Sequence, residues 1–434
     1  MTPQRLGAAL TGLLLAASAS FPGAVATDPT PTGTAAPTAS GVATDQTSQT
    51  PPPFAPCPHV RAKPPHPLPS PSPMPKRDGA LPGIGGPGLA TDALAVPPGA
   101  PPTPPNLSAR SWVVADLDTG DVIGSCAPYR YGAPASVQKL LLVATFLPKL
   151  DPKQIITVFG KDLRFEPGSS AVGLVRQGKY SVETLWLGLL LNSGNDAANV
   201  LARVGGRGDM EAGVAAMNAE ARRLGAFDTH ADTPSGLDGP HQFTTAYDLA
   251  LIARACYAMP DFLTYVGTKV AQMPPQPPKD THGFQIQNEN RLLWEYPGAL
   301  GGKTGYTDLA RHTFVGAAER NGRRLMVTLM GAERKPVRGW EQAAQLLNWG
   351  FAVSKGSAVG RLVRPGEATP PPDRTPPPPS ATTVPVRAAA GAVGSGGRPL
   401  LVGAVALGGA VAVVWLSVLI ASRRRRTRRT STLD

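Results

Sequence analysis

Proline distribution sets the strongest limit on how this chain can fold. The sequence holds 49 prolines in 434 residues, and most of them lie in two stretches, 28–109 and 359–386. Proline fixes φ and has no backbone N–H, so helix interiors and central strands tolerate it poorly. The proline-poor stretch between the two spans about 245 residues, which is long enough to bury a sizeable core. We therefore expect one folded body with a proline-rich segment on each side.

The positive charge of the chain does not indicate a nucleic-acid partner. The formal net charge is +12 at pH 7, but the stretch 423–429 alone contributes six arginines. The sequence shows no basic helix interleaved with aromatic residues and no zinc-finger spacing. We therefore interpret the remaining positive charge as a solvated surface and expect no nucleic-acid partner.

Both ends of the chain carry features of a protein anchored outside the cytoplasm. Residues 1–26 contain Arg5, a short apolar run and a terminal Ala-Val-Ala, which is typical of a cleaved signal peptide; an uncleaved anchor is the alternative. Residues 400–421 are uncharged and long enough to cross the hydrocarbon core of a membrane. The arginines of 422–434 place this tail in the cytoplasm by the positive-inside rule. We expect a single-pass protein of the cell membrane with an extracytoplasmic body.

These features predict a domain order along the chain. The spacer before the membrane helix is rich in Pro, Ala and Gly, so its extended form would reach on the order of 100 Å; a passive linker is the alternative. The predicted segments are a signal peptide (1–26), a proline-rich arm (27–107), a catalytic domain (108–356), the spacer (357–399), a transmembrane helix (400–421) and a basic tail (422–434).

Residue patterns within the body predict strands near both of its ends and helices between them. Strands are expected at 111–117, 122–124, 312–319 and 324–330 because these runs alternate or are rich in β-branched residues. Asn321-Gly322 between the last two is a strong signal for a two-residue hairpin. Helices are expected at 136–146, 182–191, 196–204, 210–224 and 246–257. The order predicts an α+β fold, in which an antiparallel sheet from both ends carries a central helical subdomain.

Ser136 and Lys139 form a Ser-x-x-Lys pattern at the start of a predicted helix, one turn apart on the same face. A serine hydroxyl is a weak nucleophile until a base takes its proton, and a lysine kept neutral by burial can be that base. A serine at a helix start also presents a free backbone N–H to a developing oxyanion. Taken alone, the motif fits an N-capping serine beside a surface lysine better.

Residues 193–195 read Ser-Gly-Asn and lie between two predicted helices. A hydroxyl and an amide at this place could relay a proton and hold a substrate amide. A turn between helices with capping side chains is the alternative for this motif alone.

Residues 303–305 read Lys-Thr-Gly and directly precede the predicted C-terminal hairpin, so we expect them to begin an edge strand. An ammonium and a hydroxyl there suit a carboxylate, and the glycine would let a ligand approach the backbone. A glycine-rich turn is the alternative. A phosphate-binding loop is excluded because Pro297 occupies the position of its first glycine.

The three motifs are far more specific together than singly. Ser-x-x-Lys, Ser-x-Asn and Lys-Thr-Gly in this order form the set of penicillin-binding proteins and serine β-lactamases. The stretch 108–352 resembles the low-molecular-mass D-alanyl-D-alanine carboxypeptidases beyond that trio. The matching stretches are 134–136 (Pro-Ala-Ser), 168–170 (Gly-Ser-Ser), 189–198 (Leu-Leu-Leu-Asn-Ser-Gly-Asn-Asp-Ala-Ala), 234–238 (Pro-Ser-Gly-Leu-Asp), 290–293 (Asn-Arg-Leu-Leu) and 303–307 (Lys-Thr-Gly-Tyr-Thr).

This resemblance implies a β-lactamase/DD-peptidase-like fold and an activity. The implied enzyme is a serine-type carboxypeptidase that removes the terminal D-Ala from peptidoglycan stem pentapeptides during cell-wall maturation. It implies that β-lactams inhibit the enzyme covalently and that no metal or cofactor takes part. The implied catalytic residues are Ser136 (acyl-enzyme), Lys139 (base) and Ser193 (proton shuttle to the leaving amine).

The resemblance also implies how the substrate is held. Asn195 would bind the substrate's peptide amide. Lys303 and Thr304 would hold the terminal carboxylate, with Gly305 as a further substrate-binding position. The oxyanion hole would consist of the backbone N–H groups of Ser136 and Tyr306.

Residues 310–312 (Ala-Arg-His) differ from the small residues of the commoner family pattern. Arg311 would therefore either add a second cation near the carboxylate site or be an ordinary surface arginine.

Several other functions use parts of the same pattern. A class A β-lactamase would need a Glu-x-x-Leu-Asn loop, which the sequence lacks, and usually Ser-Asp-Asn instead of Ser-Gly-Asn. A DD-endopeptidase acting on cross-links would use the same residues, so the sequence leaves it open. A catalytically silent wall-binding protein would make the trio vestigial. A Ser-His-Asp hydrolase and a zinc peptidase lack their motifs here.

The three cysteines, Cys57, Cys126 and Cys256, exclude a disulfide-dense scaffold and a four-cysteine metal site. Thiols outside the cytoplasm tend to pair. Cys256 lies in an apolar predicted helix, where we expect a buried free thiol. Cys57 and Cys126 could pair and strap the proline-rich arm near Ser136; three free thiols are the alternative.

Overall fold

The computed structural model describes residues 55–60, 74–75, 81 and 83–370. The predicted signal peptide, transmembrane helix and basic tail lie outside the described residues. Within the described part, no single helix is long and apolar enough to cross a membrane; one pair, 246–257 and 260–267, passes by length and composition together but is bent by 101°.

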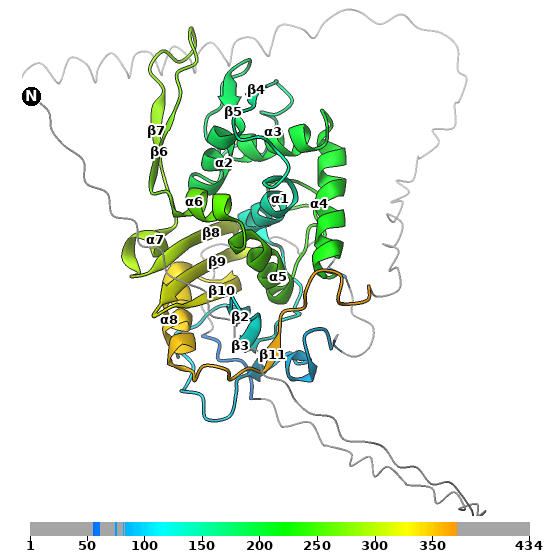
Figure 1. Ribbon diagram of the computed structural model, residues 1–434, viewed down its shortest axis with the longest axis vertical. Helices are drawn as coiled ribbons and strands as arrows, with labels where there is room; N and C mark the ends of the chain where they lie inside the picture. Colours follow the sequence, from blue (N-terminus) through cyan, green and yellow to red (C-terminus); the bar gives the residue numbers. More distant parts are fainter. Residues whose placement is uncertain (1–54, 61–73, 76–80, 82, 371–434) are drawn as a thin grey trace, which may run out of the picture. The chain divides into compact units, whose positions relative to one another are not determined.

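A seven-stranded antiparallel sheet forms the centre of the body (Figure 1). Its strands follow the order β1-β3-β2-β10-β9-β8, and β11 also pairs with β3. The early strand β2 pairs directly with the late strand β10, which confirms a sheet built from both ends of the body. The strands are β1 (Leu94–Ala95), β2 (Ser111–Asp116), β3 (Asp121–Cys126), β8 (Ala299–Thr307), β9 (Arg311–Arg320), β10 (Arg323–Ala332) and β11 (Gly360–Arg361).

A two-residue turn joins β9 to β10. Asn321 has φ +51° and Gly322 has φ +70°, and Arg320 pairs with Arg323 across the turn. A type I′ turn needs positive φ at both central residues, which Asn and Gly adopt most readily. The predicted hairpin is therefore confirmed.

Most of the helices lie in the chain between β3 and β8, and they cover one face of the sheet (Figure 1). α4 shows why these helices begin and end where they do: Asp209 accepts the backbone N–H of Glu211, and Gly225 ends the helix at φ +82°. The bounds predicted for α2, α4 and α5 are confirmed. The helices are α1 (Lys139–Phe146), α2 (Val182–Leu191), α3 (Asn195–Gly205), α4 (Met210–Leu224), α5 (Ala246–Tyr257) and α6 (Pro260–Gly267).

The single helix predicted over 136–146 is wrong at its start. Ala135–Gln138 form a 3₁₀ turn, η2, and α1 begins only at Lys139. Ala135 enters the turn with φ +50°, which a helix does not allow. In a 3₁₀ turn, residues three apart lie directly above one another, so Lys139 stands over Ser136.

The opposite face of the sheet packs against α8 (Gly339–Ala352), which the sequence analysis did not predict. Trp112 of β2 and Trp349 of α8 meet edge to face, with ring centroids 6.1 Å apart. Both tryptophans belong to a buried apolar cluster between α8 and the sheet. Further unpredicted elements are η1 (Pro87–Leu89), β4 (Ile155–Thr157), β5 (Lys179–Ser181), β6 (Val270–Met273), β7 (Phe284–Gln287) and α7 (Arg291–Glu295).

Residues that the sequence analysis placed outside the catalytic domain also pack against the sheet. Leu89 and Leu107 are fully buried before the predicted catalytic domain, and Leu362 is buried after it. β1 and β11 each pair with β3. The boundaries at 107 and 356 stay a prediction, but apolar residues on both sides of them join the same core.

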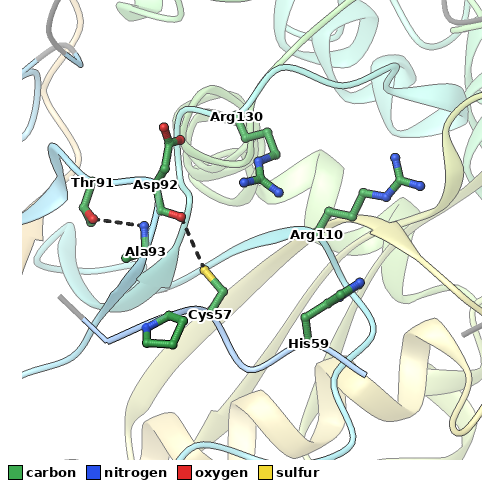
Figure 2. Close-up of a pocket in the computed structure, with 8 residues that line it drawn as sticks. Cys57, His59, Thr91, Asp92, Ala93, Arg110 and Arg130 are labelled. Carbon is green, nitrogen blue, oxygen red and sulfur yellow. Dashed lines mark hydrogen bonds between the residues drawn. The ribbon is translucent and has the colours of Figure 1, made fainter. Parts of the chain in front are cut away.

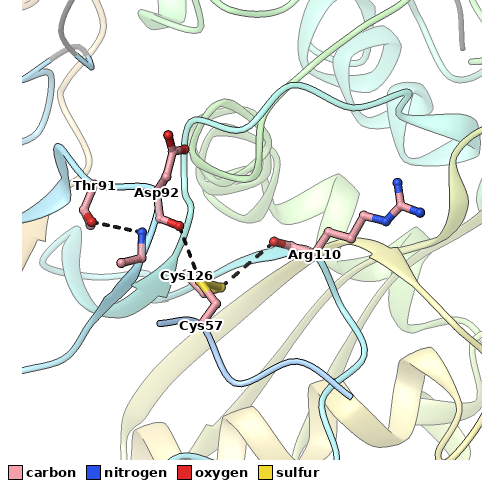
Figure 3. The surroundings of a disulfide bond; sticks show 6 residues. Cys57, Thr91, Asp92, Arg110 and Cys126 are labelled. Atoms are coloured by element: carbon pink, nitrogen blue, oxygen red, sulfur yellow. Dashed lines mark hydrogen bonds between the residues drawn. A yellow bond between two sulfur atoms is a disulfide. The ribbon is translucent and has the colours of Figure 1, made fainter. Parts of the chain in front are cut away.

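A disulfide ties the N-terminal arm to the sheet. Cys57 and Cys126 are joined, with their Cα atoms 5.6 Å apart, at the end of β3 (Figure 3). Backbone hydrogen bonds support the same contact, because the Leu94 N–H donates to Ala55. Cys256 is buried as a free thiol in α5, where its Sγ lies 3.2 Å from the Leu140 carbonyl oxygen. The predicted pairing and the predicted free thiol are both confirmed.

We predict that thiol counting will separate these cysteines. The native chain should react with no alkylating reagent at Cys256, because burial excludes the reagent and raises the pKa of its thiol. The denatured, unreduced chain should take up one label, and the reduced chain three. Intact mass gives the count directly. Three labels without reductant would contradict the disulfide.

Candidate active site

Lys139 lies at the centre of a set of three oxygen atoms. Its Nζ is 2.7 Å from Ser136 Oγ, 2.8 Å from Asn195 Oδ1 and 2.9 Å from the Ser235 carbonyl oxygen. The side chain is completely buried, whereas Ser136 is partly exposed. The alternative of a surface lysine beside a capping serine is therefore wrong.

Burial also changes the acid–base behaviour of Lys139. Loss of solvation, and then the positive charge of Lys303, hold the pKa of Lys139 well below its ordinary value. Asp196 and Glu289 oppose this shift more weakly. A neutral amine 2.7 Å from a partly exposed hydroxyl is positioned to take its proton.

The Ser-Gly-Asn motif occupies the turn between α2 and α3, as predicted. Ser193 is buried with φ +58°, and Asn195 is the first residue of α3. The Asn195 side chain links two groups, because its Oδ1 accepts from Lys139 and its Nδ2 donates to Ser169 Oγ at 2.9 Å. The assigned roles of Ser193 and Asn195 toward a substrate stay predictions.

The carboxylate of Asp196 fixes the loop that faces this turn. It accepts backbone N–H groups from Val172, Gly173 and Leu174, each at 2.9 Å. A carboxylate with several backbone donors is a strong anchor, because each bond is charge-assisted. The loop bearing Ser169 is thereby held against the start of α3.

The Lys-Thr-Gly motif lies inside β8 rather than at its beginning, because the strand starts at Ala299. Gly301 and Gly302 belong to the strand, and the pairing with β9 shifts register between Ala299 and Gly301. A bulge of this kind explains why the glycines resemble a turn in the sequence. The predicted edge position of the strand is confirmed, because β8 ends the sheet.

Lys303 is buried on β8, and its Nζ donates to the Thr304 carbonyl oxygen at 2.8 Å. Burial lowers the pKa of Lys303 to about 8, and Glu289 offsets part of this change. Thr304 is partly exposed on the same strand. An ammonium and a hydroxyl at a sheet edge are suitable partners for a carboxylate.

Gly305 brings β8 into contact with the backbone of Ser136. A Cβ on Gly305 would lie 2.9 Å from the backbone nitrogen of Ser136 and 2.4 Å from Thr313 Oγ1. Only a residue without a side chain allows this approach. The edge strand and the Ser136 turn therefore lie directly against each other, and Tyr306, the next residue, is 44% exposed.

Three further residues of the site had no predicted role. Ser235 supplies a backbone carbonyl to Lys139, and Ser169 bonds to Asn195. Asp238, in the same loop as Ser235, accepts a hydrogen bond from Thr307 Oγ1 at 2.8 Å and so links this loop to β8. These residues lie in the stretches 168–170 and 234–238. The resemblance of those stretches to the family was the one sequence signal that pointed to them.

Arg311 is neither a surface arginine nor an unpaired cation. It is 2% exposed, and its Nε and Nη2 each lie 3.0 Å from the carboxylate of Glu333. Its guanidinium also stands 5.4 Å from the ring centroid of Tyr306. Its charge is therefore balanced by Glu333.

Two hollows lie near these elements. One, of about 1210 Å³, begins at Thr304 and Gly305 and runs toward α8. The other lies beside the disulfide, where Arg110 and Arg130 point into an open space (Figure 2), and none of its lining residues belongs to the predicted site. In the part of the chain that the structure describes, no group of three or more His, Cys, Asp or Glu side chains could hold a metal ion.

We predict that Gly305→Ala will reduce kcat/KM about 100-fold on a peptide ending in D-Ala-D-Ala, since displacing reacting groups by about 1 Å costs that much. The added methyl must displace Ser136 or β8. Gly83→Ala is the matched control, because nothing lies within 4 Å of its Cβ position. Thermal unfolding of both variants checks that they fold. Unchanged kcat/KM in folded Gly305→Ala would contradict the close contact.

Comparison with known proteins places this geometry in a family. Residues 99–334 match the Peptidase_S11 family, described as D-alanyl-D-alanine carboxypeptidase. The D-alanyl-D-alanine carboxypeptidase DacB2 of Mycobacterium tuberculosis is 44% identical over 62% of this chain and 91% of its own length. The DacD enzyme of Salmonella typhimurium is 35% identical over 61% of this chain and 67% of its own length.

Solved structures show the same likeness. A D-alanyl-D-alanine carboxypeptidase from Mycobacterium tuberculosis superposes with a TM-score of 0.58 at 43% identity, over 62% of this chain and 99% of that one. The Streptomyces K15 DD-transpeptidase gives a TM-score of 0.55 at 26% identity, over 58% of this chain and all of that one.

Proposed function

The chain belongs to the Peptidase_S11 family of D-alanyl-D-alanine carboxypeptidases, and we propose that Ser136 is the nucleophile with which it removes the terminal D-Ala of peptidoglycan stem pentapeptides. The enzyme is a serine peptidase of cell-wall metabolism. The observation that carries the assignment of the nucleophile is the 2.7 Å contact between Ser136 Oγ and the buried Lys139 Nζ.

In the proposed acylation step, neutral Lys139 takes the hydroxyl proton while Ser136 Oγ attacks the carbonyl carbon of the penultimate D-Ala. The backbone N–H groups of Ser136 and Tyr306 hold the negative charge that develops on the carbonyl oxygen. The C–N bond to the terminal D-Ala then breaks, and the proton held by Lys139 passes through Ser193 to the leaving amine, which returns Lys139 to its neutral form. The product is an ester on Ser136 and free D-Ala.

In the proposed deacylation step, water attacks the ester, Lys139 accepts a proton from the water, and Ser136 recovers its hydroxyl proton. No metal or cofactor is required for either step. A β-lactam would take the place of the peptide substrate, because its ring carbonyl can acylate the same Oγ and leave a slowly hydrolysed ester on Ser136.

Substrate binding in this proposal depends on the edge of β8. Lys303 and Thr304 hold the carboxylate of the terminal D-Ala, and Gly305 lets the peptide backbone approach the strand. Asn195 lies next to Lys139, where it would bind the peptide amide of the substrate once that amide enters the site. The ammonium of Lys303 must stay protonated for this role, whereas Lys139 must be neutral.

We further propose that the body works outside the cytoplasm, joined by the spacer 357–399 to a membrane helix at 400–421. The apolar, uncharged sequence of 400–421 and the arginines that follow support this anchor. The test of this anchor is whether the expressed chain associates with membranes. Truncation before residue 400 should abolish that association.

We predict that Ser136→Ala will abolish both D-Ala release from a stem pentapeptide and covalent labelling by a fluorescent penicillin. The full-length chain is the reference, and Ser357→Ala, a serine outside the site, is the control that should keep both activities. Durable labelling of the reference supports the carboxypeptidase. Rapid penicillin turnover would favour a β-lactamase, and no labelling would favour a silent wall-binding protein.

We predict a bell-shaped dependence of kcat/KM on pH. Activity should rise as Lys139 loses its proton and fall near pH 8 as Lys303 loses its own, because the second lysine must stay charged to hold the carboxylate. The two lysines interact, so the apparent pKa values belong to the pair. Lys303→Arg should move the falling limb to higher pH, since arginine stays protonated. A falling limb that does not move would exclude Lys303 as its source.

A further inference from the structure

The hollow beside the disulfide has the dimensions of a ligand pocket. Its volume of about 560 Å³ falls within the range of about 300–1,000 Å³ that is usual for such pockets. We call it the disulfide hollow, and its lining includes Cys57, His59, Asp92, Arg110 and Arg130. None of the predicted catalytic residues lines it, so the proposed reaction does not account for it.

Two arginines give the disulfide hollow its charge. Arg110 and Arg130 are both exposed, and their side chains point into the open space (Figure 2). Within the part of the chain that the structure describes, neither arginine makes an ion pair, although Asp92 also lines the hollow. Two cations beside one carboxylate leave a net positive charge, which favours an anionic ligand.

Backbone contacts hold both arginines in place. A Cβ on Gly331 would lie 2.9 Å from Arg110 Cδ, so the stem of Arg110 lies across this glycine. The Arg110 N–H donates to the Met330 carbonyl oxygen at 2.9 Å, and the Arg130 N–H donates to Ala127 at 3.0 Å. A side chain whose stem is already packed loses less conformational freedom when it binds a ligand. The charge of Arg110 is therefore positioned before any ligand arrives.

The N-terminal arm forms the remaining wall of the disulfide hollow. Cys57 is joined to Cys126, and the Val60 N–H donates to the Leu107 carbonyl oxygen at 2.8 Å. The arm is thereby fixed on both sides of His59, whose exposed imidazole can donate a further hydrogen bond. The disulfide thus completes a pocket that the sheet alone would leave open on one side.

The disulfide hollow and the candidate active site lie at the same end of the central sheet. Arg110 bonds to Met330 near the end of β10, and Gly305 of β8 pairs with Thr313 near the start of β9. β2 and β8 are three strand spacings apart in the sheet, which corresponds to about 14 Å at about 4.8 Å per spacing. One carboxylate cannot lie at both places. The hollow therefore takes a different anionic group from the one proposed to lie at the Lys-Thr-Gly motif.

We propose that the disulfide hollow is a second binding site for peptidoglycan, at which Arg110 and Arg130 bind the free carboxylates of a stem peptide other than the one being cleaved. This inference rests on the proposed function. A planar guanidinium binds a carboxylate through two parallel N–H···O bonds, which suits arginine to this ligand. A polymer held at both places presents its stem peptides at a high effective concentration, so its KM falls while the chemistry stays the same.

The test compares D-Ala release from two substrates by the full-length chain. One is a tripeptide ending in D-Ala-D-Ala whose amines are acetylated, so that its terminal carboxylate is the only one it carries. The other is uncross-linked peptidoglycan with pentapeptide stems and free carboxylates, from which attached phosphate polymers have been removed. The variant is Arg110→Glu with Arg130→Glu. The matched control, Arg176→Glu with Arg207→Glu, makes the same charge change at exposed arginines outside the hollow.

The hollow variant should raise KM for peptidoglycan about tenfold with kcat within about twofold, because two exposed charge contacts are lost and both act on binding alone. The same variant should leave both constants for the tripeptide unchanged, and the control should leave all four unchanged. The rise in KM should shrink at about 1 M salt, where the screening length is about 3 Å. Thermal unfolding checks that each variant folds. If the glutamates prevent folding, Arg110→Ala with Arg130→Ala replaces them, with a smaller expected rise on peptidoglycan alone.

The outcomes separate this second site from the proposed function. An unchanged KM for peptidoglycan in the folded variant overturns the second site, and so does an equal loss on both substrates. A loss that is seen only on peptidoglycan still carrying its phosphate polymers also overturns it, in favour of a phosphodiester ligand. Failure of the unaltered chain to release D-Ala from either substrate would instead overturn the proposed function.

Discussion

The burial of one lysine governs the arrangement of this molecule. Lys139 has no exposed surface, and its Nζ is met by oxygens from three separate segments, the Ser136 turn, the start of α3 and the loop at Ser235. A buried ammonium is costly, so the surroundings favour the neutral amine while still satisfying its hydrogen bonds. Each of the three segments is itself anchored: the turn by β8, α3 by Asp196, and the loop by Thr307.

The sheet makes this arrangement possible because its edge strand touches the turn. β8 carries Lys303 buried and Gly305 without a side chain, so the strand supplies charge close to Lys139 and still leaves room for Ser136. The positive charge of Lys303 lowers the pKa of Lys139. The pKa of Lys139 lies well below its ordinary value and that of Lys303 falls to about 8. Two titratable groups whose environments push their pKa values apart are a common source of a base and a cation in one site.

Sequence patterns predicted the features that depend on neighbours along the chain. The Asn321-Gly322 hairpin and the bounds of α4 are local, and both were found. The 3₁₀ turn before Lys139 depends on a positive φ at Ala135, which no residue type there signals. Ser235 acts through a backbone carbonyl, and Glu333 pairs with Arg311 only because β9 and β10 are neighbours. Such partners are set by tertiary packing, which a single sequence does not display.

The pairing of β2 with β10 has a consequence for the chain during its synthesis. β10 lies between β2 and β9 in the sheet, although more than 200 residues separate β2 from β10 in sequence. Until β10 has left the ribosome, β2 has no strand to pair with on that side. β8 then has no connection to the sheet that contains β2 and β3. Ser136 and Lys139 are made early, but β8, the strand that meets them, is made late. A chain that ends before β8 therefore lacks the contact between that strand and the Ser136 turn.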